Sequence, residues 1–182
     1  MTPLEHLLLA RSVRHGDFVL ASGQRSSFYI DCRLTTMSAE GMVLVGQAGL
    51  QAIRAAAWAA TAVGGLTLGA DPVAYAIAAA SFGSRPALDA FTVRKEAKGH
   101  GTRRLIEGNF RPGGSVVIVE DVITSGSSAL QAIQAVRSEG GQVAGVLAVV
   151  DREQGGRQAL EAAGYAVRAL TTASALGLRD GT

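Results

Sequence analysis

The sequence has one cysteine, two lysines and three histidines among 182 residues, and the scarcity of cysteine and histidine excludes several kinds of site. With Cys32 alone, neither an intrachain disulfide nor a cysteine-based metal cluster can form. The histidines, at positions 6, 15 and 100, are scattered and lack the spacing of metal ligands. Neither the Walker pattern G-x-x-x-x-G-K-[ST] nor the dinucleotide pattern G-x-G-x-x-G occurs. A phosphate-binding site in this chain therefore has to be built in another way.

Targeting and membrane signals are also missing. The N-terminus lacks a basic region followed by an apolar run and a cleavage site, which predicts a cytoplasmic protein. The longest apolar stretch, residues 42–63, carries Gln47, Gln51 and Arg54 at helical spacing, so it predicts an amphipathic helix and no membrane partner. The formal charge of +2 gives little support for nucleic-acid binding, and we expect no such partner.

A composition of 48% hydrophobic and 18% charged residues predicts one packed domain over residues 1–182. Strands and helices alternate from residue 63 onward, and the central strands are apolar throughout. This pattern is typical of an α/β fold with a mainly parallel sheet covered by helices on both faces. The first 35 or so residues break the alternation and are predicted to form a small cap, or hood, over the carboxyl edge of the sheet, where α/β proteins bind ligands. The predicted strands are 18–20, 28–31, 63–67, 87–93, 116–120, 143–150 and 165–170, and the predicted helices are 3–15, 39–60, 71–80, 127–138, 154–163 and 172–176.

The most informative segment is a strand, loop and helix between residues 116 and 138. Four β-branched residues predict a buried strand that ends in two adjacent acids, Glu120 and Asp121. A loop of Thr, Ser and Gly follows at 124–128, and its backbone amides and the helix start behind it suit a phosphate. The acids are placed to accept hydrogen bonds from sugar hydroxyls. Together they predict a site for a ribose 5-phosphate, whereas the plain alternative is a strand that ends in a polar turn.

Both lysines of the chain lie in one polar segment, residues 94–104, which we call the lid loop, whereas the chain has fifteen arginines and uses only arginine for positive charge elsewhere. Lysine is a compact point charge on a flexible stem. Two glycines and few apolar residues suggest a loop that closes over a polyphosphate. The alternative is a solvated basic surface loop.

The strand–loop–helix segment resembles the phosphoribosyl-diphosphate (PRPP) signature of type I phosphoribosyltransferases. Further segments resemble the orotate phosphoribosyltransferase family more specifically, and the resemblance covers residues from about 5 to 170. It implies the type I phosphoribosyltransferase fold and the transfer of phosphoribose from PRPP to orotate, with orotidine 5′-monophosphate (OMP) and pyrophosphate as products. The segments that carry it are Ser-Gly at 22–23, Ser-Ser-Phe-Tyr-Ile-Asp at 26–31, Gly-Leu-Thr-Leu-Gly-Ala-Asp-Pro at 65–72, Arg-Lys-Glu-Ala-Lys-Gly-His-Gly at 94–101, Glu-Asp-Val-Ile-Thr-Ser-Gly at 120–126 and Asp-Arg-Glu-Gln-Gly-Gly at 151–156.

The resemblance also implies roles for individual residues. Catalytic roles fall to Lys95, Lys98, His100 and Asp121, with His100 either a proton donor to pyrophosphate or a structural hydrogen-bonding residue. Orotate is implied to lie among Phe28, Tyr29, Thr124 and Arg152, with Arg152 pairing with its carboxylate. The residues implied to bind PRPP are Leu68, Gly69, Ala70, Arg94, Lys95, Lys98, His100, Glu120, Asp121, Val122, Ile123, Thr124, Ser125, Gly126, Ser127 and Ser128.

The family resemblance further implies Mg²⁺, held through PRPP and water with Asp121 as the candidate protein contact, and a homodimer whose lid loops reach into the neighbouring subunit's site. The sequence departs from relatives at Ala21, where some have lysine, at Gly99, where many have an acid, and at Glu120, where Asp is commoner. Two other readings stay open at this stage: a phosphoribosyltransferase for another base, and a non-catalytic regulator with the same fold.

Overall fold

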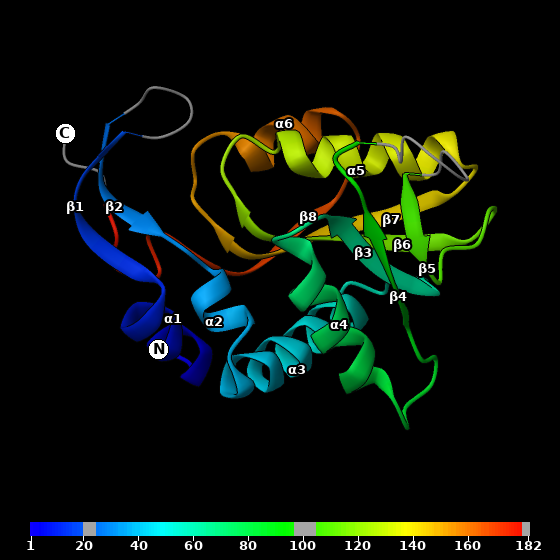
Figure 1. Cartoon of the computed structure of the whole chain (residues 1–182), viewed down its shortest axis with the longest axis horizontal. Coiled ribbons are helices and arrows are strands. Elements are labelled where there is room, and N and C mark those ends of the chain that lie inside the picture. The colour runs from blue at the N-terminus through cyan, green and yellow to red at the C-terminus, as the bar shows by residue number, and fades with distance from the viewer. Residues whose placement is uncertain (20–24, 97–104, 180–182) are drawn as a thin grey trace.

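Six strands form the central sheet of the computed structural model, which describes residues 1–19, 25–96 and 105–179 (Figure 1). Helices cover both faces of this sheet, which confirms the predicted α/β class. The elements in chain order are α1 (Pro3–Arg11), β1 (Val13–Val19), β2 (Arg25–Ile30), α2 (Arg33–Thr36), α3 (Ala39–Ala55), β3 (Ala62–Leu66), α4 (Ala70–Ser81), β4 (Asp89–Val93), β5 (Ile106–Gly108), β6 (Ser115–Ile123), α5 (Ser127–Ser138), β7 (Gln142–Asp151), α6 (Gly156–Ala162) and β8 (Val167–Thr172).

The strand order is β5-β4-β3-β6-β7-β8, and every neighbouring pair is parallel except β4 and β5. β3 and β6 occupy the middle of the sheet, and Ile123 of β6 pairs with Asp151 of the neighbouring β7 where these two strands end. Because parallel neighbours end at the same edge, the acids at the end of β6 and the residue after β7 emerge side by side.

Each face of the sheet has its own apolar core. Val117 and Val119 of β6 pack with α3 and α4 on one face, whereas Val116 and Ile118 pack with α5 on the other. Figure 1 shows the same layering, with α3 and α4 on one side and α5 and α6 on the other. Both sides of β6 are buried, which explains why its sequence is apolar without alternation.

The hood consists of α1, the antiparallel hairpin β1–β2 and α2, and it stands beside the main sheet (Figure 1). Thr2 and Glu5 form a capping box that starts α1, with Glu5 N donating to Thr2 Oγ1 and Thr2 N donating to Glu5 Oε2. Thr171 on β8 donates to the same Glu5 carboxylate at 2.9 Å, and Leu4 and Leu8 are buried in the core beside α3. These contacts fix the hood against the sheet.

Several predicted boundaries were wrong, each for a tertiary reason. The first helix ends at Arg11 and not at residue 15, because Val13 already pairs with Ile30 in the hairpin. The helix predicted to reach residue 60 ends at Ala55, where the chain turns and places Trp58 against Gly145 of β7. The predicted helix 172–176 is a single turn closed by Leu176 N and Thr172 O, because β8 continues to Thr172.

Two short elements, α2 and β5, were not predicted at all, and β6 runs three residues further than expected, to Ile123. Within the described residues, no helix is long and apolar enough to cross a membrane.

Candidate active site

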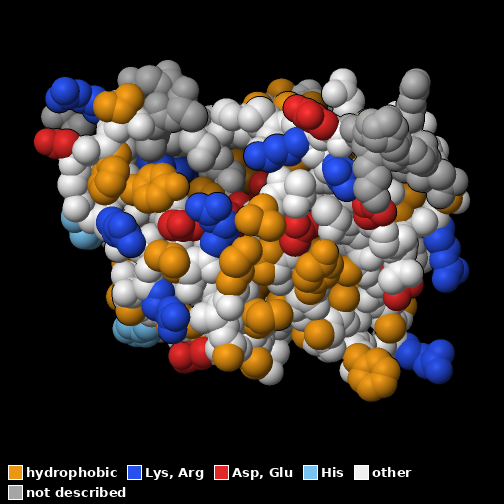
Figure 2. Space-filling model, in the orientation of Figure 1, with side chains coloured by type: hydrophobic (Ala, Val, Ile, Leu, Met, Phe, Trp, Pro, Cys, Tyr) orange, Lys and Arg blue, Asp and Glu red, His pale blue; other side chains and the backbone are white. Residues whose placement is uncertain are grey.

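A cleft of about 450 Å³ lies at the carboxyl edge of the sheet, between the hood and the main body. Figure 2 shows acidic and basic side chains next to one another where the surface is hollowed between these two parts. The segments that follow β3, β6 and β7 meet there with the end of β2. The lining residues are Tyr29, Ile30, Asp31, Cys32, Arg33, Leu66, Thr67, Leu68, Gly69, Lys95, Glu120, Asp121, Val122, Thr124, Ser125, Ser128 and Arg152.

A smaller hollow of about 110 Å³ lies over the start of α5 and is lined by residues 120 and 122–129. Gly126 precedes the helix with a φ of 80°, a left-handed conformation that glycine adopts without strain. No side chain caps this helix, while the hydroxyls of Ser125 and Ser127 lie 3.1 Å apart at its entrance. Helix amides and two hydroxyls therefore face a space suited to a phosphate.

The two acids at the end of β6 are in different surroundings. Glu120 is only 5% exposed, and among the described residues its buried Oε1 has no hydrogen-bond partner. Burial, and then the charge of Asp121, raise the pKa of Glu120 from 4.5 to about 8. Burial also raises the pKa of Asp121, opposed by the hydrogen bond that Val122 N donates to its Oδ1. An unsatisfied buried carboxyl at the edge of a cleft suits a ligand that brings hydroxyl donors.

We expect Glu120→Gln to stabilise the ligand-free protein at pH 8 and to have less effect near pH 5. Between 4.5 and about 8 the unfolded chain releases the proton of Glu120 while the folded protein keeps it, so Glu120 lowers stability progressively as pH rises through this window. Thermal unfolding at both pH values tests this, with each kcal/mol worth roughly 2–4 °C in a protein of this size. A gain that is equal at pH 5 and pH 8 would contradict the raised pKa.

The loop after β3 lies directly against Asp121. A Cβ atom added to Gly69 would sit 2.5 Å from Asp121 Oδ1, so only glycine allows this approach. The loop is held from behind by Asp71, which accepts hydrogen bonds from Thr67 Oγ1 at 2.6 Å and Thr92 Oγ1 at 2.8 Å. Residues 67–69 and the acids of β6 thus form one continuous wall of the cleft.

Arg152 follows β7 and is 6% exposed. Its guanidinium carbon lies 4.6 Å from the centre of the Phe28 ring, and its Nη2 donates to Ser26 Oγ at 3.1 Å. The neighbouring acids have other partners, since Asp151 pairs with Arg157 and Glu153 accepts from Ser174. The plain alternative for Arg152, a surface ion pair with Asp151 or Glu153, is therefore not observed.

Among the cleft residues that had no role in the sequence-based prediction are Asp31, Cys32 and Arg33. Arg33 Nε and Nη2 donate to the two oxygens of Asp31 at 2.8 and 3.1 Å, which lowers the pKa of Asp31. The buried Cys32 thiol has its pKa raised by burial and by the charges of Asp121 and Asp31. The available sequence signal for this pair was an acid and a base two positions apart after a strand.

The structure brings most of the predicted residues into these two hollows, with five exceptions. Phe28 is buried beneath Arg152, and Ala70 is buried at the start of α4. Arg94 lies 3.7 Å from Glu107 on β5 and is not among the cleft-lining residues of the described chain. Lys98 and His100 lie outside the described residues, as does Ala21. The roles of all these residues stay predictions.

Known proteins resemble this chain over almost its whole length. The orotate phosphoribosyltransferase of Rhodopirellula baltica is 43% identical over 182 residues, which cover 98% of this chain and 94% of that protein. The crystal structure of the Mycobacterium tuberculosis orotate phosphoribosyltransferase with Fe(III) dicitrate is 45% identical with a TM-score of 0.85, covering 96% of this chain and 97% of that one. Its complex with PRPP is 40% identical with a TM-score of 0.80 and the same coverage. No family model matches the chain.

Proposed function

This chain belongs to the orotate phosphoribosyltransferase family, and from that premise we propose how its residues perform the reaction. It transfers the 5-phosphoribosyl group of PRPP to orotate, giving OMP and pyrophosphate in pyrimidine biosynthesis. The observation that carries the assignment of residues is the convergence, in one cleft, of a phosphate-sized hollow, a buried pair of acids and a buried arginine.

PRPP occupies the cleft with its 5-phosphate at the start of α5. The amides and hydroxyls of residues 124–128 hold this phosphate, and the acids Glu120 and Asp121 accept hydrogen bonds from the ribose hydroxyls. The burial and missing partner of Glu120 Oε1 support this placement. The pyrophosphate lies along Leu68, Gly69 and Ala70, and Lys95, which lines the cleft, and Arg94 supply positive charge.

Orotate lies between Tyr29 and Arg152, with Thr124 at its edge. Tyr29 is 39% exposed and lines the cleft, so its ring is accessible to a flat base. The Arg152 guanidinium pairs with the orotate carboxylate, because a planar fork of donors matches a carboxylate. Stacking on Phe28 and the hydrogen bond to Ser26 support a preset orientation of this guanidinium.

Bond cleavage leaves positive character on the sugar carbon and negative charge on the departing pyrophosphate. The Asp121 carboxylate stabilises the sugar, while the lysines of the lid loop stabilise the pyrophosphate. Closure of the lid loop, with His100 near the pyrophosphate, excludes water that would hydrolyse the activated sugar. Each contribution is larger in the transition state than in the bound substrates, so it raises turnover.

Mg²⁺ completes the proposed site, and the residues present fit it. Among the described residues no cluster of three acids, histidines or cysteines could enclose a metal, which agrees with Mg²⁺ held mainly by substrate oxygens and water. Asp121, with the ribose hydroxyls beside it, is the nearest candidate contact. When bound, the ion neutralises charge on the diphosphate.

We expect chelation by EDTA to abolish turnover and added Mg²⁺ to restore it, because PRPP then regains its neutralising ion. The folded protein should keep its unfolding temperature in EDTA, since no described side-chain cluster depends on the ion. Full turnover in EDTA would argue against a metal-dependent reaction.

A homodimer is also part of the proposal. Several large apolar side chains of α2–α4 and their connections are exposed, including Leu34, Met37, Met42, Val43 and Tyr75. Figure 2 shows hydrophobic side chains gathered over these helices, beside the cleft. An apolar surface of this kind favours association with a second copy, which would bring its lid loop to the neighbouring cleft. Sedimentation at micromolar concentration tests this, and a monomer would contradict it.

We place the protein in the cytoplasm, as its composition predicts. The described part of the chain keeps its cysteine buried and unpaired, which suits a reducing compartment. Fractionation of cells that make the tagged protein tests this location, and recovery from an extracytoplasmic fraction would contradict it.

A further inference from the structure

We propose that Glu153 is a positioning residue for Arg152 and thereby for recognition of the orotate carboxylate. The inference rests on the proposed pairing of Arg152 with that carboxylate. Glu153 is not among the residues that line the cleft, so its effect on the ligand acts through its neighbour.

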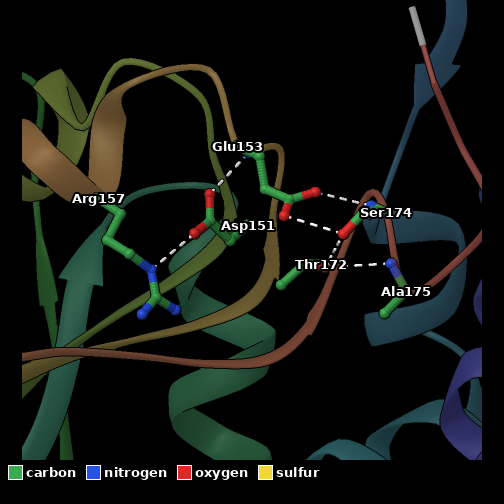
Figure 3. Close-up of polar contacts among 6 residues, drawn as sticks. All are labelled: Asp151, Glu153, Arg157, Thr172, Ser174 and Ala175. Atoms are coloured by element: carbon green, nitrogen blue, oxygen red, sulfur yellow. Dashed lines mark hydrogen bonds and ion pairs between the residues drawn. The ribbon is translucent and has the colours of Figure 1, made fainter.

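The residue before Arg152 is fixed by its own side chain. Asp151 is 2% exposed, and its Oδ1 accepts the Glu153 backbone N–H at 2.8 Å while its Oδ2 accepts Arg157 Nε at 2.9 Å (Figure 3). Its carbonyl oxygen accepts from Ala173 N, and Arg152 N donates to Ile123 O at the end of β6. The backbone therefore enters Arg152 in one defined direction.

The residue after Arg152 has an unusual conformation. Glu153 has a φ of 60°, in the left-handed region that residues with a Cβ rarely adopt. A residue other than glycine stays in this left-handed conformation only when surrounding contacts hold it. The contacts that do so here involve the Glu153 carboxylate.

Both carboxylate oxygens of Glu153 are engaged by the turn after β8. Ser174 N donates to Oε2 at 2.7 Å, and Ser174 Oγ donates to Oε1 at 2.9 Å (Figure 3). Thr172 Oγ1 lies 3.0 Å from Ser174 Oγ and accepts from Ala175 N at 3.1 Å, so the turn is itself well ordered by hydrogen bonds. Glu153 thus ties the Arg152 segment to β8 and keeps residue 153 left-handed.

The guanidinium of Arg152 is held separately, by Phe28 and Ser26 of the hood. The backbone of Arg152 depends on Glu153 for its position, and the guanidinium depends on β2. Both supports are therefore needed to orient the side chain. If the Glu153 carboxylate is removed, residue 153 can relax to a negative φ, which rotates the adjoining peptide and withdraws the guanidinium from its position. Bidentate pairing is sensitive to such a displacement.

A pair of nucleotides isolates this contact. OMP and uridine 5′-monophosphate (UMP) differ only in the carboxylate that Arg152 would hold, so the ratio of their dissociation constants measures its recognition. We expect Glu153→Ala to weaken OMP binding by about tenfold, while UMP binding changes by less than about twofold. Titration calorimetry gives both constants, and the steady-state KM for orotate should rise with the KM for PRPP unchanged.

Three variants separate the possible causes. Glu153→Gln keeps one acceptor for Ser174 and should retain most of the OMP preference. Glu153→Gly adopts the left-handed conformation without strain but lacks the carboxylate, so its OMP preference should lie between those of Glu153→Gln and Glu153→Ala. This variant keeps the test informative if Glu153→Ala folds poorly. Glu161→Ala, an exposed acid on α6, is the matched control and should behave as the parent chain.

Arg152→Ala distinguishes failure of the inference from failure of the role proposed for Arg152. Loss of the OMP preference in Arg152→Ala but not in Glu153→Ala would overturn the positioning role and leave the orotate contact intact. Equal weakening of OMP and UMP in Glu153→Ala would also overturn it, because that pattern indicates general destabilisation. An unchanged preference in Arg152→Ala would remove the premise itself.

Discussion

Asp121→Ala is expected to lower kcat by about 10²–10³, the size of effect seen when one preorganised electrostatic contact is lost in a buried site. Asp121 lies near the end of β6, where the loop at Gly69 approaches it closely, and its carboxylate accepts a hydrogen bond from Val122 N. Its charge faces the sugar carbon of the proposed PRPP complex. Because positive character on that carbon appears only during bond cleavage, kcat should fall more than the affinity for PRPP.

Asp121→Asn separates charge from packing, since it keeps the size of the side chain and an oxygen that can accept from Val122 N. The kcat of Asp121→Asn should fall nearly as far as that of Asp121→Ala. Asp89→Ala, an exposed acid on β4 away from the cleft, is the control. Pyrophosphate release under saturating substrates is the measurement, and a kcat for Asp121→Asn within threefold of the parent value would contradict an electrostatic role.

Lys98→Ala should also lower kcat by about 10²–10³ while the KM for PRPP changes little, because the charge that Lys98 meets develops on the departing pyrophosphate. This expectation comes from the sequence, where both lysines lie in the lid loop at 94–104. Equal losses in PRPP binding and turnover would argue against a role in the transition state. Arg137→Ala, a basic residue at the end of α5, is a control for the loss of one positive charge.

Mixing the Lys98→Ala and Asp121→Ala proteins tests whether the lid loop acts in the neighbouring subunit. If it does, a mixed dimer has one site with both residues intact, and random exchange should restore about a quarter of the parent activity. Exchange has to be verified independently, for instance with differently tagged chains. No recovery in the mixed dimers would show that each subunit carries a self-contained site.

The parallel strands of the main sheet were predictable because burial on both faces leaves a continuous apolar run, as in residues 116–119. Helix α5 was predicted with its observed bounds because the Thr, Ser and Gly residues before it and the two glycines after it mark its ends. Other boundaries depended on distant contacts. The pairing of Val13 with Ile30 shortens α1, and the packing of Trp58 on Gly145 ends α3, and neither is visible in the local sequence.

The site residues also divide into those recognisable from the local sequence and those that depend on distant contacts. Glu120, Asp121 and the loop at 124–128 were predictable because they are consecutive, and the resemblance supplied Arg152. The Asp31–Arg33 pair is a local contact, but its position in the cleft depends on how the hood is placed against the sheet. The support of Arg152 by Ser26 and Phe28 joins residues more than 120 positions apart, and the conformation of Glu153 depends on the turn after β8.

One measurement tests the central claim most directly: an ultraviolet assay of the purified protein with PRPP and Mg²⁺, offering orotate, uracil, hypoxanthine and adenine in parallel. We expect orotate alone to be consumed, with one pyrophosphate released for each OMP formed. Turnover of a neutral base would keep the PRPP site and contradict the orotate pocket around Arg152. The absence of turnover with every base would contradict the catalytic function and favour a regulatory protein that keeps the fold.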